Sequence, residues 1–156
     1  MQTTKWGPSA WDTFFIFSRN YPEKYNPENK EHLEVRKHTK RFYQALVYIL
    51  PCKYCRLSFK DFWKEVPIED YLDTRNDLTF WVYTIKDLVN KKLIFQEKRI
   101  FEEAISKASS SKEKNILKKE IFITIPSPPF CEVVKYYEQY RAGCSAKTKS
   151  CRNKKK

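Results

Sequence analysis

The chain has 156 residues, a formal net charge of +12 and an aromatic content of 16%, with only two glycines. This length suits one domain with a hydrophobic core, and the scarcity of glycine argues against an architecture of tight turns. No apolar run approaches the ~20 residues of a membrane span, and the first ten residues lack the apolar core of a secretory signal. We therefore expect a helix-rich cytoplasmic protein that does not contact a membrane and has no structural disulfide framework.

The first helix signal is a Ser-x-x-Asp capping box formed by Ser9 and Asp12, which follows Trp6-Gly7-Pro8. The helix should end near Tyr21-Pro22, because a residue before proline avoids the helical region. Its apolar face is expected to hold Trp11, Phe14, Phe15 and Ser18.

A long second helix is predicted from about residue 28 to residue 50, after the turn at Asn26-Pro27. Its buried stripe is expected to consist of Phe42, Ala45, Leu46, Ile49 and Leu50. The helix leads directly to the segment Pro51-Cys52-Lys53-Tyr54-Cys55, which contains a Cys-x-x-Cys pair.

This cysteine pair opens a third predicted helix that ends before Val66-Pro67. Cys52, Cys55, Phe59 and Phe62 recur at steps of three and four, so we expect two thiols and two rings on one inward face. Two thiols one turn apart can exchange between dithiol and disulfide. A pair of small buried hydrophobic residues and half of a zinc site are the alternatives.

The local charge favours the redox interpretation. Pro51 is a suitable first residue for a helix, and free amides at a helix start, together with the helix dipole, stabilise a thiolate on Cys52. Lys53 adds a positive charge beside the same sulfur.

The clearest helical periodicity predicts a core helix from about Asn76-Asp77 to Leu93. Its apolar positions are Leu78, Trp81, Val82, Ile85, Leu88 and Val89. A separate, shorter helix is predicted from Glu97 to Lys107. Four main helices with short connections favour an all-α four-helix bundle with a short fifth helix, and such bundles hold cofactors between facing helices.

Residues 1–107 are expected to form the domain, and residues 108–156 a linker and a basic C-terminal extension. The proline run Pro126–Pro129 is expected to be extended and stiff, followed by a last helix from Cys131 to Arg141. From Gln139 onward there are seven Lys or Arg residues and no acid. Such a tail is usually solvated, with a nucleic-acid or membrane-surface contact as the less favoured interpretation.

In this order the motifs resemble those of the Erv/ALR family of FAD-linked sulfhydryl oxidases, particularly the short forms of large DNA viruses. Three motifs between Trp6 and Leu93 carry the resemblance. They are Trp6-Gly7-Pro8 with Trp11 and Tyr21-Pro22, then Leu50-Pro51-Cys52-Lys53-Tyr54-Cys55, and finally Trp81 with Val89-Asn90-Lys91-Lys92-Leu93.

The resemblance implies a thiol oxidase that converts dithiol protein substrates, thioredoxin-like or viral, to disulfides and passes electrons to oxygen, giving hydrogen peroxide. It implies FAD as the cofactor, rather than a metal, and a homodimer. In a virus, the protein would be a late product located in the host cytoplasm or the virion.

The resemblance also implies residue roles. Cys55 would lie beside the flavin, and Cys52 would be the exposed sulfur that accepts electrons from the substrate. The residues expected to contact FAD are Trp6, Trp11, Phe15, Trp81, Lys86, Asp87, Asn90 and Lys92. Cys144 and Cys151, and less so Cys131, are candidates for shuttling electrons to Cys52, with exposed reduced thiols as the alternative.

Two departures from the family pattern concern the flavin site. Phe15 replaces a family histidine, and Lys86-Asp87 replaces His-Asn. Lost hydrogen bonds of ~1 kcal/mol each would weaken FAD binding rather than prevent it. The alternative function is an Erv-like dimerisation or thiol-docking module without FAD. A basic nucleic-acid-binding protein with zinc on Cys52, Cys55, Cys144 and Cys151 is a third, weaker hypothesis.

Overall fold

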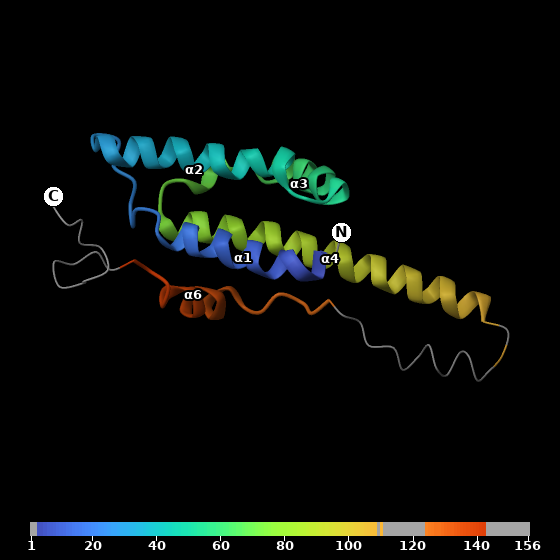
Figure 1. The fold of residues 1–156 in the computed structure, drawn as a ribbon. Coiled ribbons are helices and arrows are strands. Elements are labelled where there is room, and N and C mark those ends of the chain that lie inside the picture. Colours follow the sequence, from blue (N-terminus) through green and yellow to red (C-terminus); the bar gives the residue numbers. More distant parts are fainter. Residues whose placement is uncertain (1–2, 109, 111–123, 143–156) are drawn as a thin grey trace, which may run out of the picture.

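The computed structural model describes residues 3–108, 110 and 124–142. Its elements are α1 (Thr3–Arg19), α2 (Lys30–Ile49), α3 (Lys53–Glu65), the 3₁₀ helix η1 (Ile68–Tyr71), α4 (Arg75–Lys107) and α6 (Phe130–Glu138) (Figure 1). No β-strand is formed by these residues, which confirms the predicted all-α fold. Within the described ranges, no helix combines the length and apolar character needed to cross a membrane.

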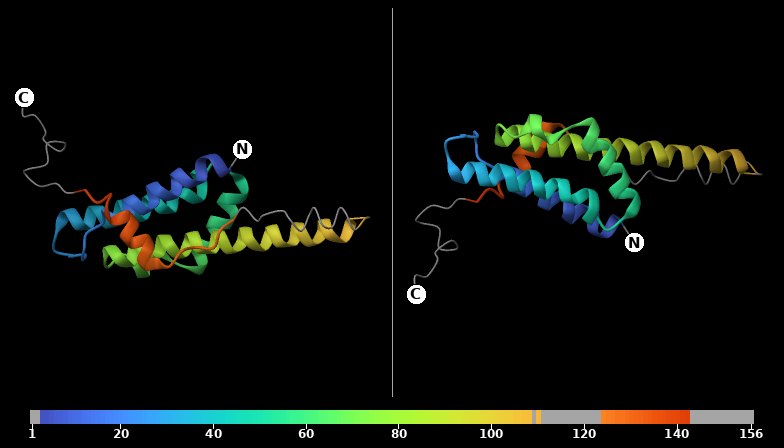
Figure 2. Two further views of the ribbon diagram at one scale, coloured as in Figure 1. Left: turned by 90° about the horizontal axis from the view of Figure 1, so that it is seen from below. Right: turned by 90° about the horizontal axis from the view of Figure 1, so that it is seen from above.

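The helices form layers around α1 and α4. Figure 1 shows α2 and α3 along one side of this pair and α6 on the other side, and the two views of Figure 2 agree. The second half of α4 extends beyond the other helices. The cysteine pair at the start of α3 therefore lies on one side of the α1–α4 pair, and the C-terminal helix lies on the other.

Aromatic side chains hold α1, α2 and α4 together. Tyr43 and Trp81 are each 1% exposed, and their ring centroids are 5.1 Å apart. The hydroxyl of Tyr43 donates a hydrogen bond to the carbonyl oxygen of Phe14 at 2.8 Å, and Trp81 Nε1 donates to the carbonyl oxygen of Val66 at 2.9 Å. Buried aromatic groups whose polar atoms are hydrogen-bonded favour a single packing arrangement. This core therefore sets the positions of α1, α2 and α4, against which α3 packs.

Helix α1 begins six residues before the predicted start at Ser9, so the interpretation of Ser9 and Asp12 as a capping box is wrong. Ser9 lies inside the helix, and its carbonyl oxygen accepts a hydrogen bond from the Thr13 hydroxyl at 2.8 Å. The additional turns place Trp6 against the core, which is a tertiary effect that a local capping pattern does not contain.

The predicted break between Leu93 and Glu97 is also absent, because α4 runs without interruption to Lys107. No proline or glycine lies in this stretch to end the helix. The separate short helix predicted from Glu97 to Lys107 is therefore wrong, because these residues are the end of α4. The last helix, predicted from Cys131 to Arg141, is confirmed as α6.

The predicted stripe of α2 needs one correction. Ile49 is 63% exposed, because it is the last helical residue before the chain turns toward Pro51. Tyr43, which was not part of the predicted stripe, takes the central buried position together with Leu46.

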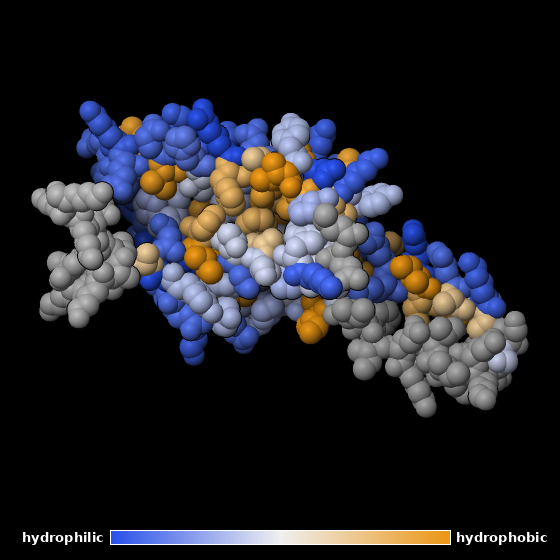
Figure 3. All heavy atoms as spheres, viewed as in Figure 1, coloured by the Kyte–Doolittle hydropathy of each residue, from blue (hydrophilic) through white to orange (hydrophobic). Residues whose placement is uncertain are grey.

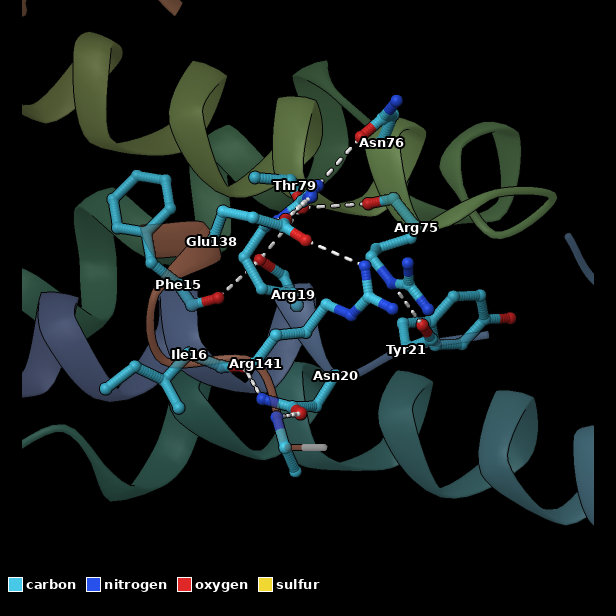
Figure 4. Close-up of polar contacts among 12 residues, drawn as sticks. Phe15, Ile16, Arg19, Asn20, Tyr21, Arg75, Asn76, Thr79, Glu138 and Arg141 are labelled. Atoms are coloured by element: carbon cyan, nitrogen blue, oxygen red, sulfur yellow. Dashed lines mark hydrogen bonds and ion pairs between the residues drawn. The ribbon is translucent and has the colours of Figure 1, made fainter. Parts of the chain in front are cut away.

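Helix α6 is fastened to the bundle by polar contacts (Figure 4). The guanidinium of Arg19, which is 5% exposed, pairs with the carboxylate of Glu138 and donates to Asn76 Oδ1 at 2.7 Å. Asn20 Oδ1 accepts a hydrogen bond from the backbone amide of Ala142 at 2.7 Å. The described part of the C-terminal extension is thus packed on α1 and α4.

Candidate active site

The backbone around the cysteine pair sets the two thiols apart. Cys52 is the N-cap of α3 with extended dihedrals (φ −92°, ψ 127°), so Pro51 precedes the helix and is not its first residue. Cys55 is inside the first turn. Arg56 Nη1 donates to the carbonyl oxygen of Leu50 at 2.5 Å, which ties the end of α2 to the start of α3.

The two thiols have opposite pKa shifts. The pKa of Cys52 is lowered, chiefly by a hydrogen bond from the Cys55 thiol and then by backbone amides at the start of α3. The pKa of Cys55 is raised to about 11 by burial, by its hydrogen bond to Cys52 and by the negative charge of Cys52, while Lys92 opposes the rise. In the dithiol form Cys52 is therefore the sulfur that loses its proton more readily.

A cleft of about 640 Å³ lies between α1, α3, α4 and the C-terminal segment. Cys55 lines it and Cys52 does not, so the expectation that both sulfurs face inward is wrong. The N-cap conformation removes Cys52 from the helical face that Cys55, Phe59 and Phe62 share. A single Cys-x-x-Cys turn thus places one sulfur in the lining of the cleft and the other outside it.

Aromatic and cationic side chains surround the cleft. Lys86 Nζ lies 5.7 Å from the ring centroid of Trp11, and burial lowers the pKa of this lysine. Lys92 Nζ donates to Ser58 Oγ at 2.5 Å. The buried indole N–H of Trp6 has no hydrogen-bond partner among the described residues, so it is available to an acceptor placed in the cleft.

The structure brings together five of the eight residues predicted to contact a cofactor. Trp6, Trp11, Lys86, Asn90 and Lys92 all line the cleft.

The other three predicted contacts lie elsewhere. Phe15, 1% exposed, stacks on Tyr137 with ring centroids 4.6 Å apart. Trp81 belongs to the core behind α3, and Asp87 pairs with Lys91 at 2.7 Å. None of the three lines the cleft, so the structure does not bring them together with the other five.

Sequence reasoning missed several residues of the cleft. Asp12, Ser58, Gln96, Thr124, Ile125 and Tyr137 line it as well. The helical spacing of Val134, Tyr137 and Tyr140 indicated that the last helix has an apolar side, but no local signal indicated what this side covers. Only the fold places residue 137 beside residue 12.

Of the remaining cysteines, Cys131 alone lies in the part of the chain that the structure describes, and it does not line the cleft. Cys131 is exposed on α6, whereas Cys144 and Cys151 lie outside the described residues. The shuttle role of these three cysteines stays a prediction. The described residues contain no group of three or more metal-ligating side chains, and the zinc hypothesis depends on Cys144 and Cys151.

The comparison with protein families decides the classification. The Erv1/Alr family matches residues 8–111, a span that contains the cysteine pair and most of the cleft. The chain belongs to the Erv1/Alr family. A similar protein is a probable FAD-linked sulfhydryl oxidase of Acanthamoeba polyphaga mimivirus, 31% identical over 120 residues that cover 74% of this chain and 78% of the viral protein. The resemblance predicted from the motifs is confirmed, and both findings support a thiol oxidase.

The cleft of this Erv1/Alr family member suits a large aromatic and anionic cofactor. Its volume falls in the range of about 300–1,000 Å³ that is typical of ligand sites. The rings of Trp6, Trp11 and Phe59 offer apolar faces, and Lys86 and Lys92 offer positive charge. The residues present therefore fit FAD next to Cys55.

Proposed function

We propose that this protein is an FAD-dependent thiol oxidase that forms disulfides in protein substrates and gives hydrogen peroxide from oxygen. One observation carries the proposal: Cys55, the second sulfur of the Cys-x-x-Cys pair, lines an aromatic and cationic cleft of about 640 Å³. Membership of the Erv1/Alr family and the similarity to the mimivirus protein support it.

The thiol chemistry follows from the different positions of the two sulfurs. A substrate thiolate attacks Cys52 Sγ in the oxidised pair, a mixed disulfide forms, and Cys55 Sγ leaves as a thiolate. A second substrate thiolate then attacks the substrate sulfur of the mixed disulfide. This step releases the substrate disulfide and the Cys52 thiolate, and the pair retains two electrons.

The protein controls how well Cys55 serves as the leaving group. Two of the three causes that raise its pKa, the hydrogen bond to Cys52 and the charge of Cys52, are absent while Cys52 is in a mixed disulfide. The nearby ammonium group of Lys92 then favours the Cys55 thiolate.

FAD, when bound in the cleft, supplies a two-electron acceptor that returns the electrons to oxygen. Trp6, Trp11, Lys86, Asn90 and Lys92 would hold it, with the rings providing contact area and the lysines offsetting its negative charge.

We also propose that two copies of the chain form a homodimer, as the family resemblance implied. Figure 3 shows hydrophobic side chains gathered between α1 and α2 on the face viewed in Figure 1. Phe17 of α1 is 52% exposed, and its ring lies 5.3 Å from that of Phe42 of α2. The proposed substrates are thioredoxin-like or viral dithiol proteins, and the proposed location is the cytoplasm or the virion.

The purified protein tests the proposal directly. It should contain flavin, consume oxygen in the presence of a small dithiol and produce hydrogen peroxide. Cys52→Ser and Cys55→Ser should each abolish turnover, whereas Cys131→Ser, on the exposed thiol of α6, should retain it. A colourless, inactive protein would favour the alternative, an Erv-like dimerisation or thiol-docking module. Activity that survives Cys55→Ser would reject the assignment of the cysteine pair.

A further inference from the structure

The segment 124–142 lies beyond the part of the chain that matches the Erv1/Alr family, which ends at residue 111. It nevertheless reaches the cleft, because Thr124, Ile125 and Tyr137 are among the residues that line it. The cleft is therefore completed by residues from outside the matched domain.

Tyr137 is the most constrained of these residues. Its side chain is 9% exposed, and its ring stacks on Phe15 at a centroid distance of 4.6 Å and an interplanar angle of 14°. Its hydroxyl donates to Asp12 Oδ1 at 2.6 Å, and the Asp12 side chain also borders the cleft. Burial and this hydrogen bond hold the pKa of Tyr137 far above its ordinary value, so the hydroxyl remains a donor.

The rest of the segment is anchored on both sides of the cleft. Thr124 Oγ1 donates to Glu97 Oε1 at 2.6 Å, and Asn90 Nδ2 donates to Ser127 Oγ at 3.0 Å. Asn90 itself lines the cleft and is 9% exposed. At the other end of the segment, the ion pair with Arg19 holds Glu138, which is next to Tyr137 in the chain. The position of the segment is thus set by α1 and α4, the same helices that carry the proposed cofactor contacts.

Electrostatics gives Tyr137 a second effect. The carboxylate of Asp12 at the cleft would repel an anionic cofactor. The hydrogen bond that the Tyr137 hydroxyl donates to this carboxylate partly offsets its negative charge. Lys86 provides positive charge on the same side of the cleft. Burial lowers the pKa of this lysine, and the nearby Asp12 carboxylate partly opposes that shift.

From these contacts we infer that the segment 124–137 closes one side of the FAD cleft through Thr124, Ile125 and Tyr137, and that Tyr137 is a cofactor-binding residue supplied from outside the matched Erv1/Alr domain. The inference rests on the proposed function, since it concerns how FAD is held. It goes beyond that function because it assigns binding to a segment that the family match does not include.

Titration of the full-length apoprotein with FAD, followed by fluorescence, tests the role of Tyr137. Tyr137→Ala should raise the dissociation constant roughly tenfold, as expected for the loss of one aromatic contact and the unmasking of a carboxylate. Tyr137→Phe, which keeps the ring, should give a smaller increase. Tyr140→Ala, on the 45% exposed ring one turn later, should match the wild type. Equal affinity of Tyr137→Ala and Tyr140→Ala would overturn the inference.

Hydrogen exchange provides a second test that uses only the wild-type protein, so its result does not depend on whether a variant folds. Addition of FAD to the apoprotein should slow amide exchange in residues 130–138, because occupation of the cleft stabilises the wall. Unchanged exchange there, with FAD bound, would contradict the inference while leaving the oxidase proposal intact. A wild-type protein that binds no FAD would instead reject the proposed function and the inference with it.

Discussion

At the scale of single residues, the reactivity of the pair depends on which groups surround each sulfur. Cys52 has amides at a helix start and a thiol donor, whereas Cys55 is desolvated against the cleft and faces the charge of Cys52. Lys92 is the one cation that lowers the pKa of Cys55 among the causes found in the described part of the chain. Removal of the Cys52 thiol should therefore make Cys55 a better leaving group, and removal of the Lys92 charge should make it a poorer one.

Replacement of Cys52 by alanine should lower the pKa of Cys55 from its value of about 11, because a hydrogen bond and a negative charge that disfavour the thiolate are lost. Addition of Lys92→Gln in this background should raise the pKa again. The pH dependence of Cys55 alkylation measures both shifts. Lys91→Gln is the matched control, since Lys91 pairs with Asp87 instead. Identical alkylation profiles for the two lysine variants would refute the role of Lys92.

The resemblance to the Erv/ALR family singled out Cys55 and the residues Trp6, Trp11, Lys86, Asn90 and Lys92, and all six line the cleft. Their contact with FAD stays a prediction. The helical spacing did not predict that Cys52 leaves the helical face, since this depends on the extended backbone of an N-cap, although the family resemblance implied an exposed Cys52. Nor could it predict the contact of Tyr137 with Asp12, which joins residues 125 positions apart. Local motifs identify residues that can take part in the chemistry. Which distant residues complete the cleft depends on tertiary packing.

At the scale of elements, one nearly buried cation contributes to holding α6 on the bundle. Arg19 is 5% exposed and has two partners, Glu138 and Asn76. Arg19 also holds the pKa of Glu138 below its ordinary range, with Arg141 adding to the effect. Because a buried guanidinium without its carboxylate is costly, the docking of α6 should be sensitive to this pair.

Glu138→Gln should destabilise the protein by about 1–2 kcal/mol, a value reduced because the carboxylate is partly exposed. The pKa of Glu138 is lower in the folded state, so its contribution is present above the unfolded-state value of about 4.3 and is lost as the pH falls through the lower folded-state value. Urea unfolding of both proteins at neutral and acidic pH measures this.

The control is Glu132→Gln, which removes the same charge from α6 at an exposed position without an ion pair among the described residues. It should change stability by no more than a few tenths of a kcal/mol. A stability difference between Glu138→Gln and wild type that persists unchanged at acidic pH would show that the ion pair is not its cause.

Helix boundaries illustrate what local signals miss. The periodicity from Leu78 to Val89 correctly predicted the core of α4, because burial repeats with the helical period. The capping-box pattern at Ser9 predicted the wrong start for α1. The helix begins earlier, at Thr3, and this places Trp6 against the core. Existence of an element was thus easier to predict than its ends.

At the scale of the whole molecule, the hydrophobic side chains between α1 and α2 are the surface that the dimer proposal uses (Figure 3). Contiguous apolar patches on one face are typical of protein contact sites, because monomeric proteins rarely expose large ones. The symmetrical partner implied by the family resemblance would cover Phe17, which is 52% exposed.

Phe17→Glu should therefore convert a dimer into a monomer, since a buried carboxylate without a partner is strongly unfavourable. Sedimentation velocity should give twice the chain mass for the wild type and the single-chain mass for this variant. Tyr136→Glu, at a 54% exposed ring on α6, should leave the dimer intact. A wild-type protein that sediments as one chain would contradict the dimer proposal without affecting the redox site.

The most direct test of the central claim is anaerobic mixing of the purified protein with a small dithiol while the visible absorbance of the flavin is followed. We expect the wild-type absorbance to bleach, because electrons from the substrate reach the cleft through Cys55. Cys55→Ser should bind the same amount of flavin and remain coloured. Bleaching of the Cys55→Ser protein at the wild-type rate would contradict the account.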